Sequence, residues 1–228
     1  MTSSVDDLAP PPAHLRSAAV ACFGERVDLA VRYAHVLLTD GVVRGLIGPR
    51  ESDRIWDRHL LNCAVVAELI PQDAHVVDVG SGAGLPGVVL ALARPDLMVT
   101  LVEPLARRAA FLAEVIAELR LRQASLVRAR AEECVARRGR TKVGPADVVT
   151  ARAVAPLDRL AAWCLPLLVE GGRLLALKGD SATDEVAIHR TAIARAGGGD
   201  PEIRRCGAGL VEPPTTVVTI PRLRRAEH

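Results

Sequence analysis

A glycine-rich stretch at residues 76–87 constrains the possible folds more than any other part of the sequence. It reads Val-Val-Asp-Val-Gly-Ser-Gly-Ala-Gly-Leu-Pro-Gly, an apolar β-branched run that carries Asp78 and passes directly into Gly-x-Gly-x-Gly. Glycine adopts positive φ angles at little cost and lets the backbone come close to a ligand, and a helix behind such a loop presents free N–H groups. The stretch therefore predicts a strand, a ligand-binding turn through Gly80, Gly82 and Gly84, and a helix.

After Pro71, short β-branched runs alternate with helical stretches. The predicted strands are 75–79, 97–102, 125–130, 146–150 and 173–177, and the predicted helices are 85–93, 105–121, 157–165 and 184–196. Strands separated by helices are typical of right-handed parallel β-α-β units. Two last runs, 203–206 and 215–220, are joined by a loop alone, which predicts an antiparallel hairpin. This pattern indicates an α/β fold with a doubly wound, Rossmann-like sheet, mostly parallel and finished by a C-terminal antiparallel hairpin, as in class I methyltransferases.

The residues before Pro71 have a helical pattern instead. Apolar residues recur at three- and four-residue spacing over 27–38, and a second helix is predicted over 52–69 after a glycine-rich break. We therefore expect three parts: a flexible tail over 1–12, an N-terminal helical extension over 13–71, and a cofactor-binding sheet domain over 72–228.

The composition limits the class of protein. Half of the residues are hydrophobic, enough for a full core, and a net charge of +2 does not by itself indicate a polyanionic partner. The basic residues are almost all arginine, which fits either a GC-rich genome or the binding of phosphates and guanine edges. Five scattered cysteines without a C-x-x-C pair predict neither disulfides nor a zinc site, and no other metal site is expected. Without a signal peptide or a long apolar run, we expect a cytoplasmic protein that does not contact membranes.

Two cofactors are compatible with the glycine loop. Residues 82–87 formally satisfy the dinucleotide fingerprint G-x-G-x-x-G, but counted from Gly80, where the strand ends, the sixth position is Leu85 and the fingerprint fails. Asp78 fits a methyltransferase better, since its carboxylate can orient the loop or reach a ligand amine through water. Glu103, at the end of the second strand, can accept both ribose hydroxyls of an adenosine. We therefore predict S-adenosylmethionine as the cofactor, with an NAD(P)-dependent oxidoreductase as the alternative.

Two later strand ends should face the same crevice. After the third strand, we expect Ala131 beside the adenine and Glu132 within hydrogen-bonding reach of it, although a glutamate there also suits a helix N-terminus. After the fourth strand, Arg152 comes where the reacting ends of cofactor and substrate should meet.

Together these pieces resemble the RsmG family of rRNA guanine-N7 methyltransferases, formerly called glucose-inhibited division protein B. The matching residues are 58–61 (Arg-His-Leu-Leu), 78–87, 131–132 (Ala-Glu), 151–153 (Ala-Arg-Ala) and 177–179 (Leu-Lys-Gly), within a resemblance that spans about 27–221. It implies a cytoplasmic monomer that methylates N7 of a guanine in the decoding-region loop of 16S rRNA, within the 30S subunit or its precursor. In relatives, loss of this activity is associated with streptomycin resistance. The family's cofactor contacts carry over to Gly80, Leu85, Ala131, Glu132 and Arg152.

The chain departs from the family at Asn62-Cys63, where Asp-Ser is typical. The chemistry agrees with the resemblance, because guanine N7 has a free lone pair and needs alignment rather than a base. We expect no general base, and Arg152 is the nearest candidate for positioning the substrate.

The RNA side of the crevice is expected to hold Arg58, His59 and Lys178 beside Arg152. A surface charge, a capping or core histidine, and a solvated strand end are the respective alternatives. With five aromatic residues in the chain, a base-stacking platform is not expected. A small-molecule methyltransferase and a non-catalytic RNA-binding protein are the further alternatives for the whole chain.

Overall fold

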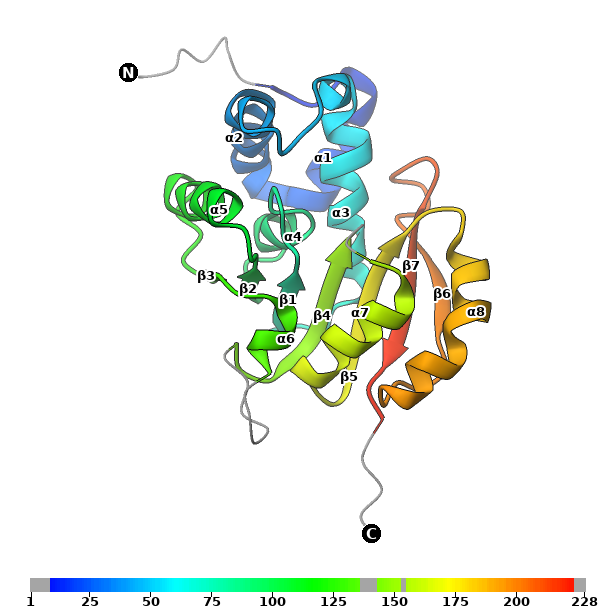
Figure 1. The fold of residues 1–228 in the computed structure, drawn as a ribbon. Helices are drawn as coiled ribbons and strands as arrows, with labels where there is room; N and C mark the ends of the chain where they lie inside the picture. Colours follow the sequence, from blue (N-terminus) through cyan, green and yellow to red (C-terminus); the bar gives the residue numbers. More distant parts are fainter. Residues whose placement is uncertain (1–8, 136–142, 153–154, 224–228) are drawn as a thin grey trace.

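The fold is built around one sheet, which a computed structural model of the chain shows together with the rest of residues 9–135, 143–152 and 155–223 (Figure 1). Among these residues, seven strands lie in the order β3-β2-β1-β4-β5-β7-β6. Their bounds are β1 His75–Val79, β2 Met98–Val102, β3 Ala124–Val127, β4 Ala146–Arg152, β5 Leu168–Lys178, β6 Glu202–Cys206 and β7 Thr215–Pro221. Strands β1 to β5 pair in parallel, and β7 is antiparallel to β5 and β6. The predicted parallel sheet with a C-terminal antiparallel hairpin is confirmed.

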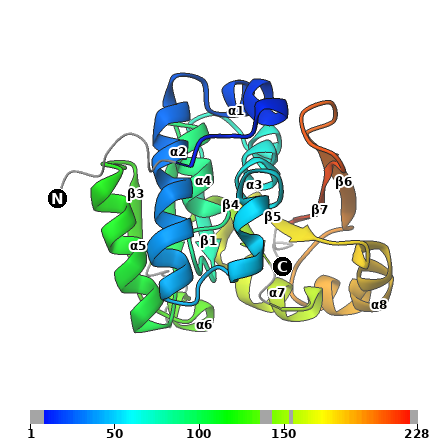
Figure 2. The same ribbon diagram turned by 90° about the horizontal axis from the view of Figure 1, so that it is seen from above.

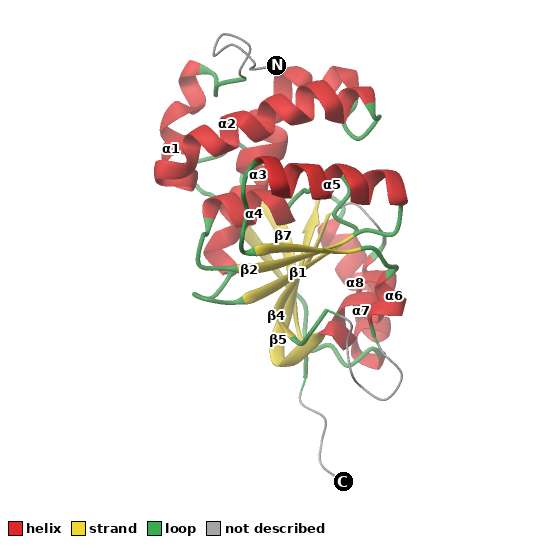
Figure 3. Cartoon of the chain, turned by 90° about the vertical axis from the view of Figure 1, so that its left-hand side faces the viewer, coloured by secondary structure: helices red, strands yellow, loops and turns green. Residues whose placement is uncertain are grey.

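Helices cover both faces of this sheet, so the fold has three layers (Figure 3). One face carries the N-terminal helical segments with α4 (Gly87–Ala93) and α5 (Ala106–Glu118), and the other carries α6 (Ala131–Cys134), α7 (Leu157–Cys164) and α8 (Ala182–Arg195). The N-terminal segments are η2 Ala13–Leu15, α1 Arg16–Phe23, η3 Gly24–Arg26, α2 Val27–Val36, η4 Leu37–Gly41, η5 Pro49–Arg54, η6 Ile55–Leu61, α3 Asn62–Ala64 and η7 Val65–Leu69. Seen from above, α2 lies alongside α4, which it contacts (Figure 2).

The two layers of helices have separate cores because the side chains of a strand alternate between the faces of the sheet. In β1, Val76 packs into the core beneath the N-terminal helices, whereas Val77 and Val79 pack into the core shared with α7 and α8. The same alternation places Asp78 on the face of Val76. The position of this carboxylate thus follows from strand geometry.

Several predicted element bounds were wrong, four of them at elements that shape the site. The third strand ends at Val127 rather than at 130, because Arg130 begins the turn that leads into α6. Strand β4 continues to Arg152, and β5 begins already at Leu168, because the two strands pair as far as Arg152 opposite Leu177. Helix α4 begins at Gly87 rather than at 85, since the preceding residues form the turn of the glycine loop.

The N-terminal part is helical, as predicted. The second helix begins at Pro49 instead of residue 52 and ends at Leu69. Along its length it changes from 3-10 to π, then to α and back to 3-10 geometry. Residues 1–8 of the predicted tail lie outside the described residues, but at Ala9 the chain already contacts the helices, since the indole N–H of Trp56 donates to the Ala9 carbonyl (2.9 Å). Within the described part of the chain, no helix is both long enough and apolar enough to cross a membrane.

Candidate active site

The glycine loop between β1 and α4 contains glycines that serve different purposes. Gly80, Gly82 and Gly84 all have positive φ angles, at 72°, 58° and 98°. A Cβ at Gly84 would lie 2.6 Å from the Val88 side chain and 2.7 Å from the Tyr33 hydroxyl, so glycine is needed there for packing. A Cβ at Gly82 would meet nothing closer than the Gly80 carbonyl at 3.8 Å. Gly84 is therefore needed where the loop packs against Val88 and Tyr33, whereas Gly82 faces open space.

Asp78 holds the loop from beneath. Its buried carboxylate accepts hydrogen bonds from the Gly87 backbone N–H (3.1 Å) and from the Thr150 hydroxyl (2.8 Å). Burial raises the pKa of this carboxyl from 3.8 to about 6. Because β4 lies beside β1, these bonds connect the glycine loop to the end of a second strand. The structure thus shows Asp78 orienting the loop, one of the two roles predicted for it.

Tyr33 of α2 supports the loop from the N-terminal extension. Its fully buried hydroxyl donates to the Ala83 carbonyl (2.6 Å), and burial raises the pKa of this hydroxyl well above its usual value. The sequence analysis missed this residue, since a tyrosine within an apolar helical pattern is typical of an ordinary core position. The hydrogen bond shows that the extension shapes the loop directly.

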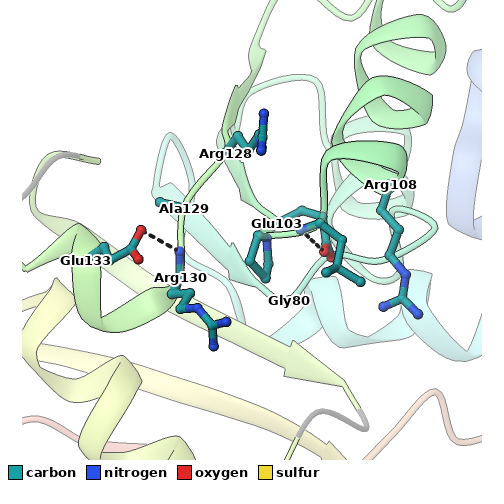
Figure 4. Close-up of a pocket in the computed structure, with 9 residues that line it drawn as sticks. Gly80, Glu103, Arg108, Arg128, Ala129, Arg130 and Glu133 are labelled. Atoms are coloured by element: carbon teal, nitrogen blue, oxygen red, sulfur yellow. Dashed lines mark hydrogen bonds between the residues drawn. The ribbon is translucent and has the colours of Figure 1, made fainter.

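A cleft of about 640 Å³ opens beside Gly80, at the carboxyl ends of β1, β2 and β3 (Figure 4). Its lining residues are Gly80, Glu103, Pro104, Leu105, Arg108, Arg128, Ala129, Arg130 and Glu133. The Glu103 carboxylate accepts the Gly82 N–H on one oxygen and the Leu105 N–H on the other, both at 2.9 Å. A carboxylate has about four acceptor positions, so two are left for a pair of hydroxyl donors. Glu103 is thereby fixed in place at the wall of the cleft, with only 1% of the residue exposed, and its binding of a ribose diol stays a prediction.

A second cavity of about 260 Å³ adjoins this cleft and shares Gly80, Pro104, Ala129 and Arg130 with it. Its remaining lining residues are Val79, Val102, Ala131, Glu132, Arg159 and Trp163. The arginine Arg159 stacks on the Trp163 ring, 5.1 Å from its centroid. Mostly apolar walls with a few polar side chains suit a flat heterocycle such as adenine. Sequence reasoning predicted Ala131 and Glu132 but missed Trp163 and Arg159, which lie on α7 outside the quoted motifs.

Arg152 lies in a separate cluster at the end of β4. Its guanidinium donates to the Cys63 sulfur (3.0 Å), the Arg58 carbonyl (3.3 Å) and His59 Nδ1 (3.0 Å). Because an arginine can only donate, Nδ1 must be the acceptor, and His59 Nε2 therefore carries the proton that it shares with Glu51 (2.9 Å). Burial and the neighbouring Arg152 lower the pKa of His59, which keeps this imidazole neutral. The structure thus brings Arg58, His59 and Arg152 together from segments more than 90 residues apart, whereas Lys178, predicted beside them, bonds to Ala155 and Glu185. That these residues bind RNA stays a prediction.

Comparison with known proteins identifies this arrangement. The family model for rRNA small subunit methyltransferase G matches residues 26–211. The ribosomal RNA small subunit methyltransferase G of Salinispora tropica is 65% identical over 217 residues, 95% of this chain and 90% of the relative. That of Mycolicibacterium gilvum is 54% identical over 212 residues, 93% and 90% of the two chains. The chain belongs to the rRNA small subunit methyltransferase G family.

Solved structures agree on the fold. The apo form of the S-adenosylmethionine-dependent methyltransferase SibL has a TM-score of 0.58 at 18% identity and covers 92% of this chain and 71% of SibL. A SAM-dependent O-methyltransferase from Thermotoga maritima has a TM-score of 0.53 at 16% identity, with 73% and 66% covered. Family and fold together confirm the predicted methyltransferase and its cofactor, S-adenosylmethionine, and do not favour an oxidoreductase.

The departure from the family at Asn62-Cys63 has a structural context. Asn62 accepts a hydrogen bond from the Thr215 hydroxyl of β7, and the Cys63 sulfur accepts one from Arg152. Burial raises the pKa of the Cys63 thiol, so it stays protonated. Both side chains therefore act as neutral acceptors that connect the extension to the sheet.

Four other residues considered in the sequence analysis are buried or only partly exposed. Leu85 is buried in the core under the N-terminal helices, and Cys164 is buried in α7. Lys178 donates to the Ala155 carbonyl (2.9 Å) and the Glu185 carboxylate (2.7 Å), with 9% of its side chain exposed, so the alternative of a solvated strand end is wrong. Arg58 is half-exposed and pairs with Glu51 at 3.4 Å.

Proposed function

We propose that this methyltransferase transfers a methyl group to N7 of a guanine in the decoding-region loop of 16S rRNA, within the 30S subunit or its precursor. The single observation that carries the choice of atom is the chemistry at the end of β4. Arg152 there offers a guanidinium held by His59 and Cys63, and Thr150 is committed to the buried Asp78 carboxylate. Among the described residues of this cluster, no group is placed to remove a proton from a substrate amine. A ring nitrogen with its own lone pair needs none.

The cofactor, when bound, supplies an electrophilic methyl on a sulfonium sulfur. The residues of the chain then have to place two reactants in line, which is a task of proximity and orientation. We assign the ribose hydroxyls to Glu103, the adenine to the cavity of Ala131 and Glu132, and the open side of the loop to Gly80 and Gly82.

Arg152 has the remaining role of holding the base. Two of its terminal hydrogens point to Arg58 and His59, and one points to Cys63, which leaves further N–H donors unassigned. Such a donor can bind guanine O6 and leave N7 free to attack. With N7 attacking, the methyl group would leave the sulfur as the N7–methyl bond forms, and the purine would take up the positive charge, so the residues around Arg152 would have no proton to remove.

We further infer that the protein acts as a monomer in the cytoplasm, and that residues 13–71 are an extension that positions the site of the domain at 72–228. Two hydrogen bonds support the second point. Tyr33 bonds to the glycine loop, and His59 bonds to Arg152. We also keep Arg58, His59 and Lys178 as candidates for binding RNA.

The decisive experiment uses 30S subunits from cells that lack this modification. Purified protein and methyl-labelled S-adenosylmethionine should produce label that chemical cleavage at 7-methylguanine maps to one guanine of the decoding-region loop. Free nucleosides and small metabolites serve as the alternative acceptors. Label on another atom, or on a metabolite in preference to the 30S subunit, would contradict the proposal.

A further inference from the structure

The larger cleft carries more positive charge than its cofactor requires. Three arginines line it, Arg108 from α5 and Arg128 and Arg130 from the segment that joins β3 to α6 (Figure 4). S-adenosylmethionine has a sulfonium, an ammonium and one carboxylate, so it could pair with one guanidinium at most. Arg108 and Arg128 line this cleft and not the adjoining cavity, which places them beyond the adenine position.

The carboxylates that line the cleft, Glu103 and Glu133, are not paired with these arginines. Glu103 accepts the Gly82 and Leu105 N–H groups, and Glu133 accepts the Arg130 backbone N–H at 3.2 Å. Both acids are thus engaged with the backbone. Within the described part of the chain, none of the three guanidiniums forms an ion pair shorter than 4.0 Å.

Arg108 adds an independent observation. Its Nε atom is buried and has no hydrogen-bond partner among the described residues. The Arg108 side chain as a whole is partly exposed, but this one donor is shielded from water and lacks an acceptor, which is costly. The arrangement becomes favourable when an anion enters the cleft and accepts from the guanidinium.

We propose that Arg108, Arg128 and Arg130, whose guanidiniums lie apart around the cleft (Figure 4), form an extended anion subsite along its rim, and that this subsite binds phosphate groups. The proposal rests on the proposed function for the source of those phosphates, the backbone of the substrate RNA. Guanidinium forks match phosphate oxygens, and arginines that touch phosphates fix the register of a nucleic acid without reading its sequence. The RNA would then extend across the carboxyl edge of the sheet, from Arg58 and Arg152 at one end to Arg128 at the other.

The test compares RNA affinity with cofactor affinity in the same variants. The double variant Arg108→Ala/Arg128→Ala removes two of the guanidiniums. Arg128→Ala alone is the second variant, because it changes only an exposed residue and should stay folded even if the double variant does not. Arg122→Ala is the matched control, because Arg122 is an exposed arginine between α5 and β3, at the opposite edge of the sheet. Dissociation constants are measured for a fluorescent fragment of 16S rRNA over a range of KCl concentrations, and for S-adenosylhomocysteine by calorimetry.

We expect the double variant to bind RNA about tenfold or more weakly, and the slope of log affinity against log salt to become shallower by about 0.7 for each phosphate that the protein no longer neutralises. Its affinity for S-adenosylhomocysteine should match that of the Arg122→Ala control. If cofactor affinity falls in parallel with RNA affinity, the arginines belong to the cofactor site and the proposal is wrong. Unchanged affinity for every ligand also overturns it.

Competition by ADP and inorganic phosphate distinguishes the sources of the phosphate. If the variants lose binding of ADP but keep that of RNA, the subsite takes a nucleotide, and the assignment to RNA fails while the anion site stands. These binding measurements do not depend on methyl transfer. Should the wild-type protein methylate an atom other than guanine N7, the proposed function fails, and the subsite is still tested.

Discussion

The two ends of the candidate site are built in different ways. At the cofactor end, the Glu103 carboxylate is held by backbone groups, the N–H groups of Gly82 and Leu105. The Arg152 end is a network of side chains, in which Glu51, His59 and Arg152 lie in a row from two distant segments. Backbone donors keep their places under substitution, whereas a row of side chains depends on each member. We therefore expect the cofactor end to tolerate many changes and fail at its glycines, and the Arg152 end to respond to each change in graded steps.

The largest effect is expected at the glycine loop. Gly82→Val should weaken S-adenosylhomocysteine binding about a hundredfold or more, because the new side chain enters the open space of the loop, and it should lower the melting temperature only moderately, through the strain of a β-branched residue at φ 58°. Gly84→Val should instead lower the melting temperature strongly, because its side chain would strike Val88 and Tyr33. Calorimetric titration and thermal unfolding of both variants separate the two roles. Equal loss of stability in both would show that Gly82 is structural as well.

Arg152 should have the next largest effect, on turnover rather than on the cofactor. Arg152→Ala removes the donor to His59 and Cys63, and we expect kcat/KM on 30S subunits to fall by the equivalent of about 1.5–3 kcal/mol in transition-state stabilisation, the range for hydrogen bonds to charged groups. Affinity for S-adenosylhomocysteine should change little, since Arg152 lines neither cavity. Arg152→Lys is the control that keeps the charge and loses the fork. A loss of cofactor affinity as large as the loss of turnover would place Arg152 in the cofactor site, as the family resemblance implies.

Variants of Glu103 test the cofactor end of the site. Glu103→Ala should weaken S-adenosylhomocysteine binding by about 1–3 kcal/mol, the cost of a lost hydrogen bond to a charged group. Glu103→Gln keeps one acceptor oxygen and should lose less. Titration calorimetry at one salt concentration measures both, and an unchanged affinity would remove Glu103 from the ribose position.

The smallest effect is expected at Glu51, and it depends on pH. The Glu51 carboxylate stabilises protonated His59, so Glu51→Gln should lower the pKa of His59 further and move the acid limb of the activity profile to lower pH. Glu51→Ala also removes the acceptor that fixes the tautomer and should cost about 1 kcal/mol in kcat/KM at neutral pH. Profiles of kcat/KM between about pH 5 and 8, the range in which histidine titrates, check this for both variants. Superimposable pH profiles would show that Glu51 does not affect turnover through His59 and Arg152.

His59 gives the same network a predicted effect on stability. Its folded pKa lies below the unfolded value of 6.5, so neutral His59 stabilises the fold fully above pH 6.5, and this contribution is lost as the pH falls through the folded pKa. Urea unfolding of the wild type and of His59→Gln across this range should show the acid-side loss in the wild type alone.

Much of this protein is determined locally, and the sequence by itself predicts those parts. The β1 strand, the glycine loop, Glu103 nineteen residues after Gly84 and the final hairpin depend on alternation, turn residues and spacing within a few tens of residues. Strand ends were harder to predict than strands, as the extension of β4 to Arg152 illustrates, since pairing with a neighbour decides where a strand stops.

The tertiary structure alone decided which side chains meet across long separations. Tyr33 reaches Ala83 over 50 residues, and Arg152 reaches His59 over 93. The lining residues Arg108 and Trp163 belong to no motif and enter the site through the packing of α5 and α7. The physical reason is that periodicity fixes the face on which a residue lies, while its partner depends on how whole helices and strands pack together.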